Sequence, residues 1–358
     1  MSGGVDSSVV AAMLKNEGYD VIGITLQLYD HGKSINKKGA CCAGKDIKDA
    51  QRIAEQIGIP HYVFDYEKEF KKNVIDDFAR SYVNGETPIP CVKCNETVKF
   101  NDLLNAAKQM NSDCLATGHY VRRKLGLHGV ELHRALNEKK DQSYFLFSTQ
   151  KKQLDFLRFP LGEIKSKDET RNLAKKYKLK VADKPDSQDI CFITQGNYSD
   201  LIKKLHPNSN REGDIINEKG EVLGKHKGLI NYTIGQRKGI GIGGGMPYYV
   251  LKINIKDNNL TVGSKKSLKR KSFYIKNINW LDNKSFLNPS DNSWKFKIKI
   301  RSSQPYEEAF VFPITEKSAR VEFKELNSEA ISPGQACVFY SLENNRVFGG
   351  GWIRKEEN

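Results

Sequence analysis

The chain has 358 residues, of which 38% are hydrophobic, and a formal net charge of +15. This length favours two or three domains, and this apolar content excludes wholesale disorder. No run of 18 apolar residues occurs, and no charged-then-apolar leader precedes the first motif, so we expect a cytoplasmic protein that neither crosses a membrane nor is secreted.

The first half of the chain alternates helical patterns with short apolar runs. Apolar residues from Val5 to Leu14 recur at helical spacing, and a second helix is predicted from about Asp46 to Ile57. Runs rich in β-branched or aromatic residues predict a buried strand at Val21–Leu28 and further short strands at His61–Asp65 and Asp113–Tyr120. This alternation predicts an α/β fold, with a Rossmann-like parallel sheet that is covered by helices and binds ligands at the carboxyl ends of its strands.

The pattern changes after about Asn197. Residues 213–228 are typical of a hairpin, and the glycine-rich residues 239–245 predict a tight loop, since no helical pattern follows to complete a dinucleotide site. From Phe273 onward, period-two runs predict the antiparallel strands of a barrel or a sandwich. We therefore predict three domains: an α/β domain at residues 1–197, a small central β domain at 198–268 and a C-terminal antiparallel β-barrel at 269–358.

The stretch "SGGVDSS", from Ser2 to Ser8, is a candidate phosphate-binding turn. Gly3 and Gly4 let backbone N–H groups approach a phosphate closely, and the N-terminus of the following helix adds favourable charge. Asp6 would repel a bare phosphate, so its presence favours a bridging Mg²⁺ ion. The glycine–lysine ending of a Walker A loop is missing, and the alternative is a turn of small residues without a ligand.

This loop resembles the PP-loop of ATP pyrophosphatases, which split ATP between its α and β phosphates. Five further stretches are similar to signatures of one such family, the tRNA-specific 2-thiouridylases. They are "PCVKCNETVKF" (Pro90–Phe100), "LATGHY" (Leu115–Tyr120), "KDQSYFL" (Lys140–Leu146), "DSQDICFI" (Asp186–Ile193) and "NYTIGQRKGIGIGG" (Asn231–Gly244). The resemblance spans nearly the whole chain. It implies ATP-dependent 2-thiolation of the wobble uridine of tRNA, with ATP and Mg²⁺ as cofactors and a PP-loop catalytic domain.

The resemblance also implies which residues bind the nucleotide. Gly118 would lie by the adenosine, and the backbone of Leu26 would contact adenine. The full implied set is Ser2, Gly3, Gly4, Val5, Asp6, Ser7, Leu26 and Gly118. Family members carry a short apolar strand before the loop that ends in a residue such as methionine. We therefore expect Met1 to be an internal methionine, and the first strand of the catalytic domain to be missing from this sequence.

Seven cysteines, an odd number spread over a long chain, indicate reduced thiols rather than a disulfide framework. From the residues alone, Cys94 and Cys191 are typical of buried structural cysteines. The resemblance implies instead that Cys191 carries a persulfide and that Cys94 is the nucleophile that releases its sulfur, which leaves a Cys94–Cys191 disulfide. Nearby Lys93 or a helix N-terminus would lower the pKa of these thiols.

Cys91 completes a CxxC motif with Cys94, at a position where the family often has an acidic residue. Three interpretations remain open. Cys91 orients the active-site turn, or the pair is redox-active, or Cys91, Cys94 and Cys191 together hold an iron–sulfur cluster. The adjacent Cys41 and Cys42 receive no role, because neighbours in a strand point to opposite faces.

Further residues match positions at which the family contacts tRNA: His119, Lys140, Asp141, Gln142, Arg301, Ser302 and Gln335. From the residues alone these would be solvated surface. The net charge is +4 over residues 1–200 and +11 over residues 201–358, which suits a polyanionic partner, although a lysine-rich solvated surface explains it equally. The implied partners are tRNA and a cysteine desulfurase or sulfur-relay protein, and we expect a monomer.

Two alternative functions stay open at this point. One is another ATP pyrophosphatase, an amide- or C–N-forming synthetase, which would not need Cys94 or Cys191. The other is an inactive basic RNA-binding protein with a degenerate nucleotide loop, which would be indifferent to Asp6→Ala.

Overall fold

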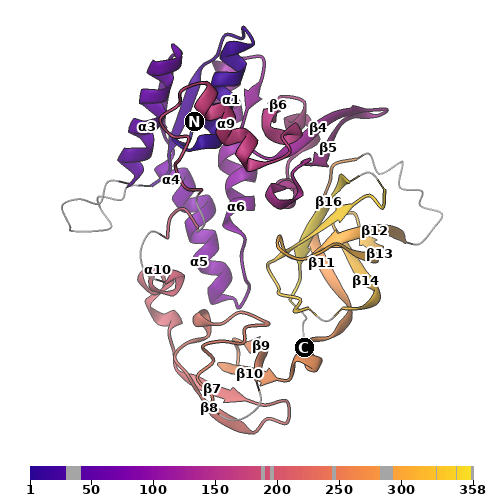
Figure 1. Cartoon of the computed structure of the whole chain (residues 1–358). Helices are drawn as coiled ribbons and strands as arrows, with labels where there is room; N and C mark the ends of the chain where they lie inside the picture. Colours follow the sequence, from indigo (N-terminus) through magenta and orange to yellow (C-terminus); the bar gives the residue numbers. More distant parts are fainter. Residues whose placement is uncertain are drawn as a thin grey trace. The chain divides into compact units, whose positions relative to one another are not determined.

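The structure is a computed structural model, and it describes residues 1–29, 42–186, 190–193, 197–243, 247–282, 293–327, 329–343 and 345–355. The chain forms two compact units (Figure 1). The first comprises residues 1–74, 91–192 and 345–347, and the second comprises residues 75–90, 193–344 and 348–358. The division into three domains stays a prediction. Within the described ranges, no helix is long and apolar enough to cross a membrane.

The first unit mixes helices with short strands. Its α-helices are α1 (Val5–Asn16), α3 (Cys42–Ile57), α4 (Glu67–Phe70), α6 (Pro90–Lys93), α7 (Leu104–Gln109), α8 (Lys151–Leu154) and α9 (Lys167–Lys176). Its strands are β1 (Gly23–Gln27), β2 (His61–Asp65), β3 (Leu115–Ala116), β4 (Val121–Gly126), β5 (Gly129–Arg134) and β6 (Leu157–Arg158). Two π-helical segments are η1 (Lys71–Ile75) and η2 (Cys94–Leu103), and 3₁₀ turns are η3 (Glu138–Lys140), η4 (Ser143–Leu146) and η5 (Pro160–Glu163).

The predicted parallel strands are present, but they form two separate pairs. β1 pairs with β2 in parallel, and β3 pairs in parallel with β6. The strand expected over Asp113–Tyr120 is reduced to two residues, because the chain turns at Gly118 to pack against the loop before α1. β2 is partly exposed, since the side chains of Tyr62 and Val63 are 46% and 42% exposed. β-branched composition therefore located this strand without fixing its burial.

Helix α1 forms the centre of the first unit's core. It buries Val5, Val9 and Val10, and its apolar surface packs with Leu161 and with Ala174 of α9. Fully burying an apolar side chain of this size contributes roughly 1.5–3 kcal/mol, so the helix is held mainly by packing. The helix ends at Asn16, just before Gly18 with φ +91°, as predicted. The loop that precedes α1 is therefore attached to a rigid element.

The second unit contains two β modules, and its described residues also form two α-helices and three 3₁₀ turns. Its remaining elements are α5 (Asp76–Val83), α10 (Tyr198–Leu205), β7 (Gly213–Ile216), β8 (Val222–His226), β9 (Tyr249–Asn254), β10 (Asn259–Gly263), β11 (Arg270–Trp280), β12 (Trp294–Lys299), β13 (Glu307–Thr315), β14 (Ser318–Asn327), β15 (Ala336–Tyr340) and β16 (Arg346–Ile353), with 3₁₀ turns η6 (Pro207–Ser209), η7 (Leu229–Asn231) and η8 (Lys265–Leu268). β7 and β8 form the predicted hairpin within a four-stranded sheet of order β8-β7-β10-β9.

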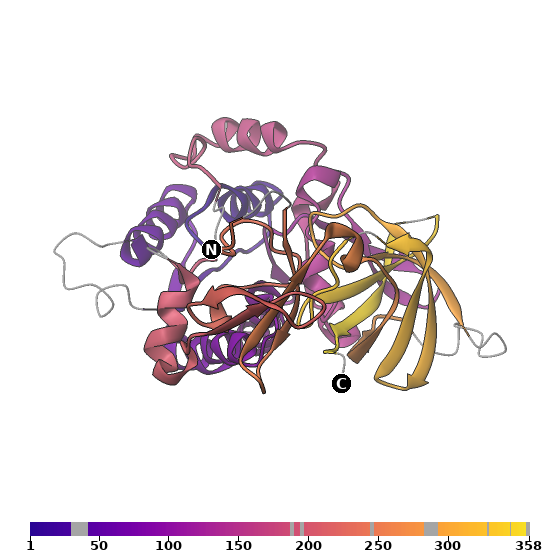
Figure 2. The same cartoon turned by 90° about the horizontal axis from the view of Figure 1, so that it is seen from below.

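The C-terminal strands close into a six-stranded antiparallel barrel. The order is β11-β14-β13-β12-β15-β16, and β16 pairs back with β11. Figure 2 shows these strands, coloured orange to yellow. Alternate residues such as Phe273, Ile275, Val321 and Phe323 point into one apolar core, which is the period-two pattern that the sequence predicted. The fold class is thus confirmed: an α/β part, a small β module and an antiparallel barrel.

Candidate active site

The glycine-rich loop occupies the N-terminus of α1. The Ser2 N–H donates to Ser7 Oγ at 3.0 Å, which ties the loop to the first turn of the helix. Gly3 has φ +69°, and a Cβ atom there would lie 2.2 Å from the carbonyl oxygen of Asp46. Only glycine fits this position. Gly4 precedes the helix without a side-chain cap, so N–H groups of the first turn remain for a phosphate.

Two strand ends border this loop. A Cβ on Gly118 would lie 3.0 Å from the Ser7 nitrogen, so the turn after β3 packs directly on the loop. Thr25 of β1 donates its hydroxyl to the Met1 carbonyl at 2.6 Å. Leu26, the next residue of β1, is half-buried. The structure thus gathers the predicted nucleotide residues around one helix N-terminus, and the residues present fit a bound triphosphate.

Asp6 belongs to a network of charged side chains. Lys167 Nζ donates to both carboxylate oxygens of Asp6, at 2.7 and 2.9 Å, and also lies 2.8 Å from Asp186 Oδ1. The Tyr120 hydroxyl donates to Asp6 Oδ1 at 2.8 Å. Lys140 Nζ donates to Asp186 Oδ2 at 2.7 Å. Asp6 therefore connects through Lys167 to a second carboxylate that lies 180 positions along the chain.

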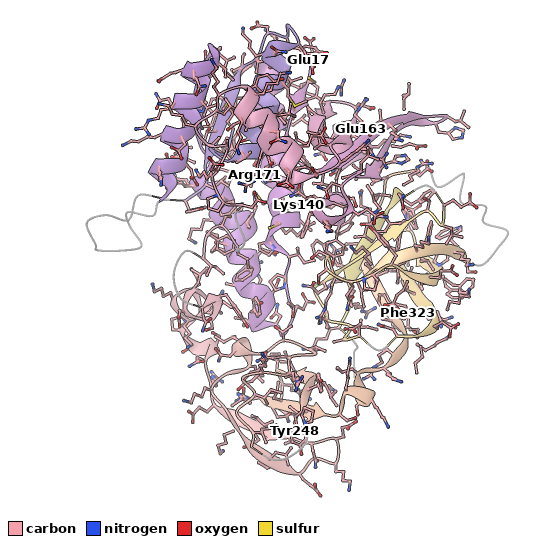
Figure 3. All side chains as sticks on the ribbon, viewed as in Figure 1. Glu17, Lys140, Glu163, Arg171, Tyr248 and Phe323 are labelled. Carbon is pink, nitrogen blue, oxygen red and sulfur yellow. The ribbon has the colours of Figure 1, made fainter. Side chains whose placement is uncertain are left out.

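The second carboxylate is held by cations on several sides. Arg171 lies 3.9 Å from Asp186, and Figure 3 labels Arg171 and Lys140, two of its cationic neighbours. Burial raises the pKa of Asp186, but the hydrogen bonds from Lys140 and Lys167 outweigh burial and hold the pKa below its usual value. Asp186 is consequently an anion over the whole neutral range.

Lys184 makes a second connection from the same segment to the loop. Its Nζ donates to the Gly3 carbonyl, to Asp46 and to Asp49, each at 2.8 Å. Burial lowers the pKa of Lys184, and the bonds to the two carboxylates reverse this and raise it. Lys184 is therefore a cation that fixes the loop backbone.

The cysteines of interest all belong to the first unit and are free thiols. Cys94 is buried, while Cys91 and Cys191 are exposed. Although Cys191 keeps accessible surface, desolvation by the surrounding chain, with smaller effects from the charges of Cys94 and Cys91, raises its pKa to about 12. Desolvation by the surrounding chain also raises the pKa of the exposed Cys91, and burial raises the pKa of Cys94. The three thiols lie close enough to influence one another's ionisation, and at neutral pH they are protonated.

The cation that acts on these thiols is Lys99. Its charge lowers the pKa of Cys91, Cys94 and Cys191, in each case against the larger effect of burial. The sequence had suggested Lys93, but Lys93 Nζ is paired with Glu96 at 3.1 Å. Cys94 and Lys99 are both in the π-helical segment η2. The backbone hydrogen bonds of a π-helix join residues i and i+5, which is the spacing of Cys94 and Lys99. In an α-helix, two residues five positions apart would lie on different faces.

The structure does not support an iron–sulfur cluster. Among the described residues, which include Cys91, Cys94 and Cys191, no group of three or more His, Cys, Asp or Glu side chains is placed to hold a metal ion. Cys41 lies outside the described residues. Cys42 begins α3, and no role is assigned to it.

Several predicted tRNA residues of the first unit make internal bonds. Asp141 accepts from the Ala135 and Ser143 N–H groups, and its side chain is 5% exposed. Gln142 Oε1 accepts from the Tyr120 N–H at 2.8 Å. His119 Nδ1 lies 2.9 Å from the Thr117 hydroxyl, and burial, with a smaller effect of Lys99, lowers its pKa to about 3. His119 is therefore neutral, and these contacts with tRNA stay predictions.

The predicted tRNA residues of the second unit lie on and beside the barrel. Arg301 Nη2 donates to the Ile234 carbonyl and to the Ser332 hydroxyl, at 3.2 and 2.9 Å. Gln335 Nε2 donates to the Thr87 carbonyl at 2.9 Å. Ser302 is exposed. Arg301 and Gln335 thus connect loops within this unit, and their roles toward tRNA also stay predictions.

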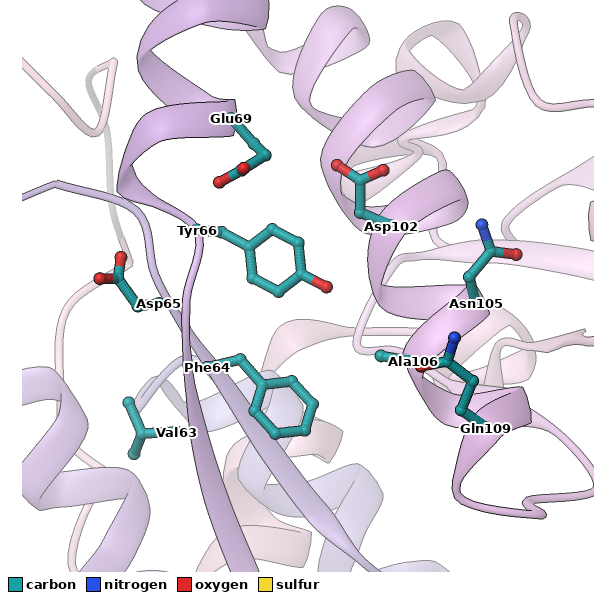
Figure 4. Close-up of a pocket in the computed structure, with 9 residues that line it drawn as sticks. All are labelled: Val63, Phe64, Asp65, Tyr66, Glu69, Asp102, Asn105, Ala106 and Gln109. Carbon is teal, nitrogen blue, oxygen red and sulfur yellow. The ribbon is translucent and has the colours of Figure 1, made fainter.

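A hollow of about 640 Å³ lies elsewhere on the first unit, between β2 and the helix that continues from η2 into α7 (Figure 4). It is lined by Val63, Phe64, Asp65, Tyr66, Glu69, Asp102, Asn105, Ala106 and Gln109. Burial, Asp102 and Glu69 raise the pKa of Tyr66. None of the residues predicted for the site lines this hollow, so the chemistry is assigned to the loop and the thiols.

Sequence reasoning missed Lys99, Lys167, Lys184 and the roles of Tyr120 and Asp186. Lys99, Tyr120 and Asp186 stand inside motifs that were recognised, so their motif membership was an available signal. Lys167 and Lys184 are two of many lysines in a basic chain, and nothing in their local pattern distinguishes them. Only their positions opposite Asp6 and Gly3 reveal them.

Comparisons with known proteins give a consistent result. Three family models match in order: tRNA methyl transferase HUP domain over residues 1–195, tRNA methyl transferase PRC-barrel domain over 199–264, and Aminomethyltransferase beta-barrel domain over 270–353. Similar proteins include the tRNA-specific 2-thiouridylase MnmA of Roseobacter denitrificans, which is 55% identical over 99% of this chain and 93% of its own length.

Two further relatives carry the same name. The protein of Ruegeria sp. (strain TM1040) is 56% identical over 99% of this chain and 93% of its own length. The protein of Ruegeria pomeroyi is 56% identical over 99% of this chain and 94% of its own length. A solved structure of NMN synthetase from Francisella tularensis covers 57% of this chain and 74% of its own, with 16% identity and a TM-score of 0.34, and that likeness carries no argument.

Proposed function

The chain belongs to the tRNA-specific 2-thiouridylase family, and from this membership we propose that it replaces the C2 oxygen of the wobble uridine of tRNA with sulfur. It is accordingly a tRNA sulfurtransferase. One observation supports the chemistry most directly. A glycine-rich loop at the N-terminus of α1 and three mutually interacting free thiols belong to the same compact unit.

The first half of the proposed reaction makes the C2 oxygen a leaving group. ATP, with Mg²⁺, would be held by Ser2, Gly3, Gly4, Val5, Asp6 and Ser7, beside Leu26 and Gly118. The uracil O2 attacks the α-phosphorus, pyrophosphate departs, and the C2 oxygen carries AMP. Loop N–H groups and the helix N-terminus stabilise negative charge on the phosphates. Asp6, with its side chain 33% exposed, is the carboxylate available to Mg²⁺.

The second half delivers sulfur. Cys191 receives a persulfide sulfur from a cysteine desulfurase or a relay protein, and its exposed position suits such delivery. The Cys94 thiolate attacks the inner sulfur of this persulfide, which forms the Cys94–Cys191 disulfide and releases hydrosulfide. Hydrosulfide then adds to C2, and AMP leaves with the original oxygen. An external dithiol must reduce the disulfide before the next turnover.

The target base must leave the anticodon stack to reach these groups. We propose that His119, Lys140, Asp141, Gln142, Arg301, Ser302 and Gln335 contribute to tRNA binding, and that the enzyme acts in the cytoplasm. The basic excess of residues 201–358 supports binding of a polyanion. The two alternatives fit less well. A C–N-forming synthetase would not need Cys94 and Cys191, and an inactive RNA-binding protein would not need the glycine-rich loop.

Thiolation of unmodified tRNA by the purified protein tests this proposal. With ATP, Mg²⁺ and a sulfide or persulfide donor, mercury-gel retardation should report 2-thiouridine. Cys94→Ser and Cys191→Ser should each abolish product, by at least about 10³-fold, because each removes a reacting sulfur. Cys114 is a half-buried cysteine of the same unit, so Cys114→Ser is the matched control and should retain activity. Full activity in either of the first two variants would refute the sulfur-transfer scheme.

A further inference from the structure

The loop before α1 and the segment that precedes Cys191 are fastened together at two points. Lys184 donates to the Gly3 carbonyl at 2.8 Å. Asp186 accepts from Lys167, which also holds Asp6. Cys191 follows Asp186 by five residues. The residue that carries the sulfur in the proposed function is therefore close in sequence to a carboxylate that shares one cation with the nucleotide loop.

All three N–H donors of the Lys167 ammonium group have acceptors in this arrangement. An ammonium group has three donors, and Lys167 Nζ lies 2.7 and 2.9 Å from the two Asp6 oxygens and 2.8 Å from Asp186 Oδ1. Its side chain is only 14% exposed, so water does not compete freely for these bonds. A fourth acceptor can be accommodated only if one of the three bonds is given up.

Resting on the function proposed above, we propose that Asp186 is a positioning residue which, through Lys167, couples occupancy of the nucleotide loop to the reactivity of Cys191. A triphosphate offers Lys167 strong anionic acceptors, and Mg²⁺ at Asp6 competes with Lys167 for the same oxygens. Either ligand draws Lys167 away from its present bonds, and the flexible lysine stem allows this movement.

The rest of the cluster makes Asp186 suited to this role. When Lys167 leaves, Asp186 still has Lys140 at 2.7 Å and Arg171 at 3.9 Å. The carboxylate therefore stays charged and turns toward these two partners. Lys184 continues to hold the segment on the loop. The expected change is thus a shift in the position of Asp186, and not local unfolding.

Coupling of this kind is measurable in both directions. If nucleotide changes the reactivity of Cys191, then alkylation of Cys191 must change nucleotide affinity by the same factor, because the coupling free energy is shared between the two sites. A merely structural ion pair would move neither quantity, since its loss changes stability alone.

The experiment measures carboxamidomethylation of Cys191 in the full chain by peptide mass spectrometry. The ligand is Mg²⁺ with an ATP analogue whose α–β bridge is a methylene, so no cleavage intervenes. The ratio of interest is the Cys191 labelling rate with the analogue to the rate without it. In the wild-type protein the analogue should change this rate by about fivefold or more. Asp186→Asn should bring the ratio to near one, while its nucleotide affinity stays within about threefold of the wild-type value. Asp186→Glu, which keeps the charge, should restore part of the effect.

Asp183→Asn is the matched control. Asp183 belongs to the same segment, but its side chain is 88% exposed and its partner, Lys175, is 3.9 Å away, so the wild-type ratio should persist. The labelling rate of Cys114 in the same samples reports unfolding of the unit as a whole. It therefore distinguishes a loss of coupling in Asp186→Asn from a loss of stability. Lys167→Met provides a second variant, and it should lose both the ratio and part of the nucleotide affinity.

Two results would overturn the inference. If the analogue binds but leaves Cys191 labelling unchanged in the wild-type protein, the coupling does not exist, and thiolation by the proposed route is unaffected. If Asp186→Asn keeps the full ratio, the coupling exists but does not pass through Asp186. Failure of the analogue to bind at all would overturn the ATP-dependent function as well, which separates the two proposals.

Discussion

The nucleotide side and the thiol side of the candidate active site are stabilised in different ways, although both belong to the first unit. On the nucleotide side, Asp6, Lys167, Asp186 and Lys184 all have partners of opposite charge within 3 Å. On the thiol side, burial raises the pKa of Cys94 and Cys191, and Lys99 is the cation that opposes it. One side is organised by charge pairing and the other by exclusion of water.

The difference teaches where each half of the reaction is prepared. Paired charges fix the loop before a ligand arrives, so little reorganisation is needed when phosphates bind. Raised thiol pKa values keep sulfur protonated and unreactive until something changes around it. We infer that the nucleotide side is ready in this state and that the thiol side must still be activated.

The largest expected effect tests the charge-paired side. Asp6→Ala removes the acceptor of Lys167 and Tyr120 together with the carboxylate proposed for Mg²⁺. Pyrophosphate release that depends on tRNA should fall by roughly 10²–10³-fold, as expected when a main electrostatic group is removed. Asp20→Ala, an exposed aspartate, is the control and should have no effect. Unchanged pyrophosphate release in Asp6→Ala would place the nucleotide elsewhere.

The next effect tests whether the thiol side is governed by burial. The thiolate is the reactive form, and the pKa of Cys191 is raised to about 12. Its iodoacetamide labelling should therefore accelerate by about tenfold per pH unit from pH 7 to pH 10 in nucleotide-free protein. Glutathione, with an ordinary thiol, should level off near its own pKa in the same series. A plateau of Cys191 labelling below pH 9 would show that burial does not control this thiol.

A smaller effect sharpens the role of Lys99. Its charge lowers the pKa of Cys94 and Cys191, so Lys99→Met should raise both further and slow their labelling at pH 8 by about threefold to tenfold. Lys93→Met removes a lysine that is paired with Glu96, and it should change labelling little. If Lys93→Met were the slower variant, the assignment of the activating cation to η2 would be wrong.

The smallest expected effect concerns stability of the nucleotide side. Tyr120→Phe removes the hydroxyl that donates to Asp6 at 2.8 Å and bonds the buried Thr170 at 2.9 Å. The free energy of opening at α1 amides, measured by hydrogen exchange, should fall by about 1–2 kcal/mol. Tyr19→Phe, at a residue that is 60% exposed, should leave it unchanged. Equal protection in both variants would mean that the hydroxyl does not stabilise the loop.

The sequence by itself determined the order and type of most elements. Period-two runs identified the barrel strands, and helical spacing located α1 to within two residues of its end. These patterns are local, because side-chain periodicity reflects which face of an element is buried. The glycines of the loop and the two cysteines were likewise visible, since each stands in a short motif.

Only the tertiary structure decided which residues meet. Lys167 contacts Asp6 across 161 positions and Lys184 contacts Gly3 across 181, and no local pattern marks one lysine among many for such a bond. The π-helical register that relates Lys99 to Cys94 is also invisible in composition. Charge pairing and hydrogen-bond register depend on distances between segments, and those distances are set by packing of the whole unit rather than by neighbours in the chain.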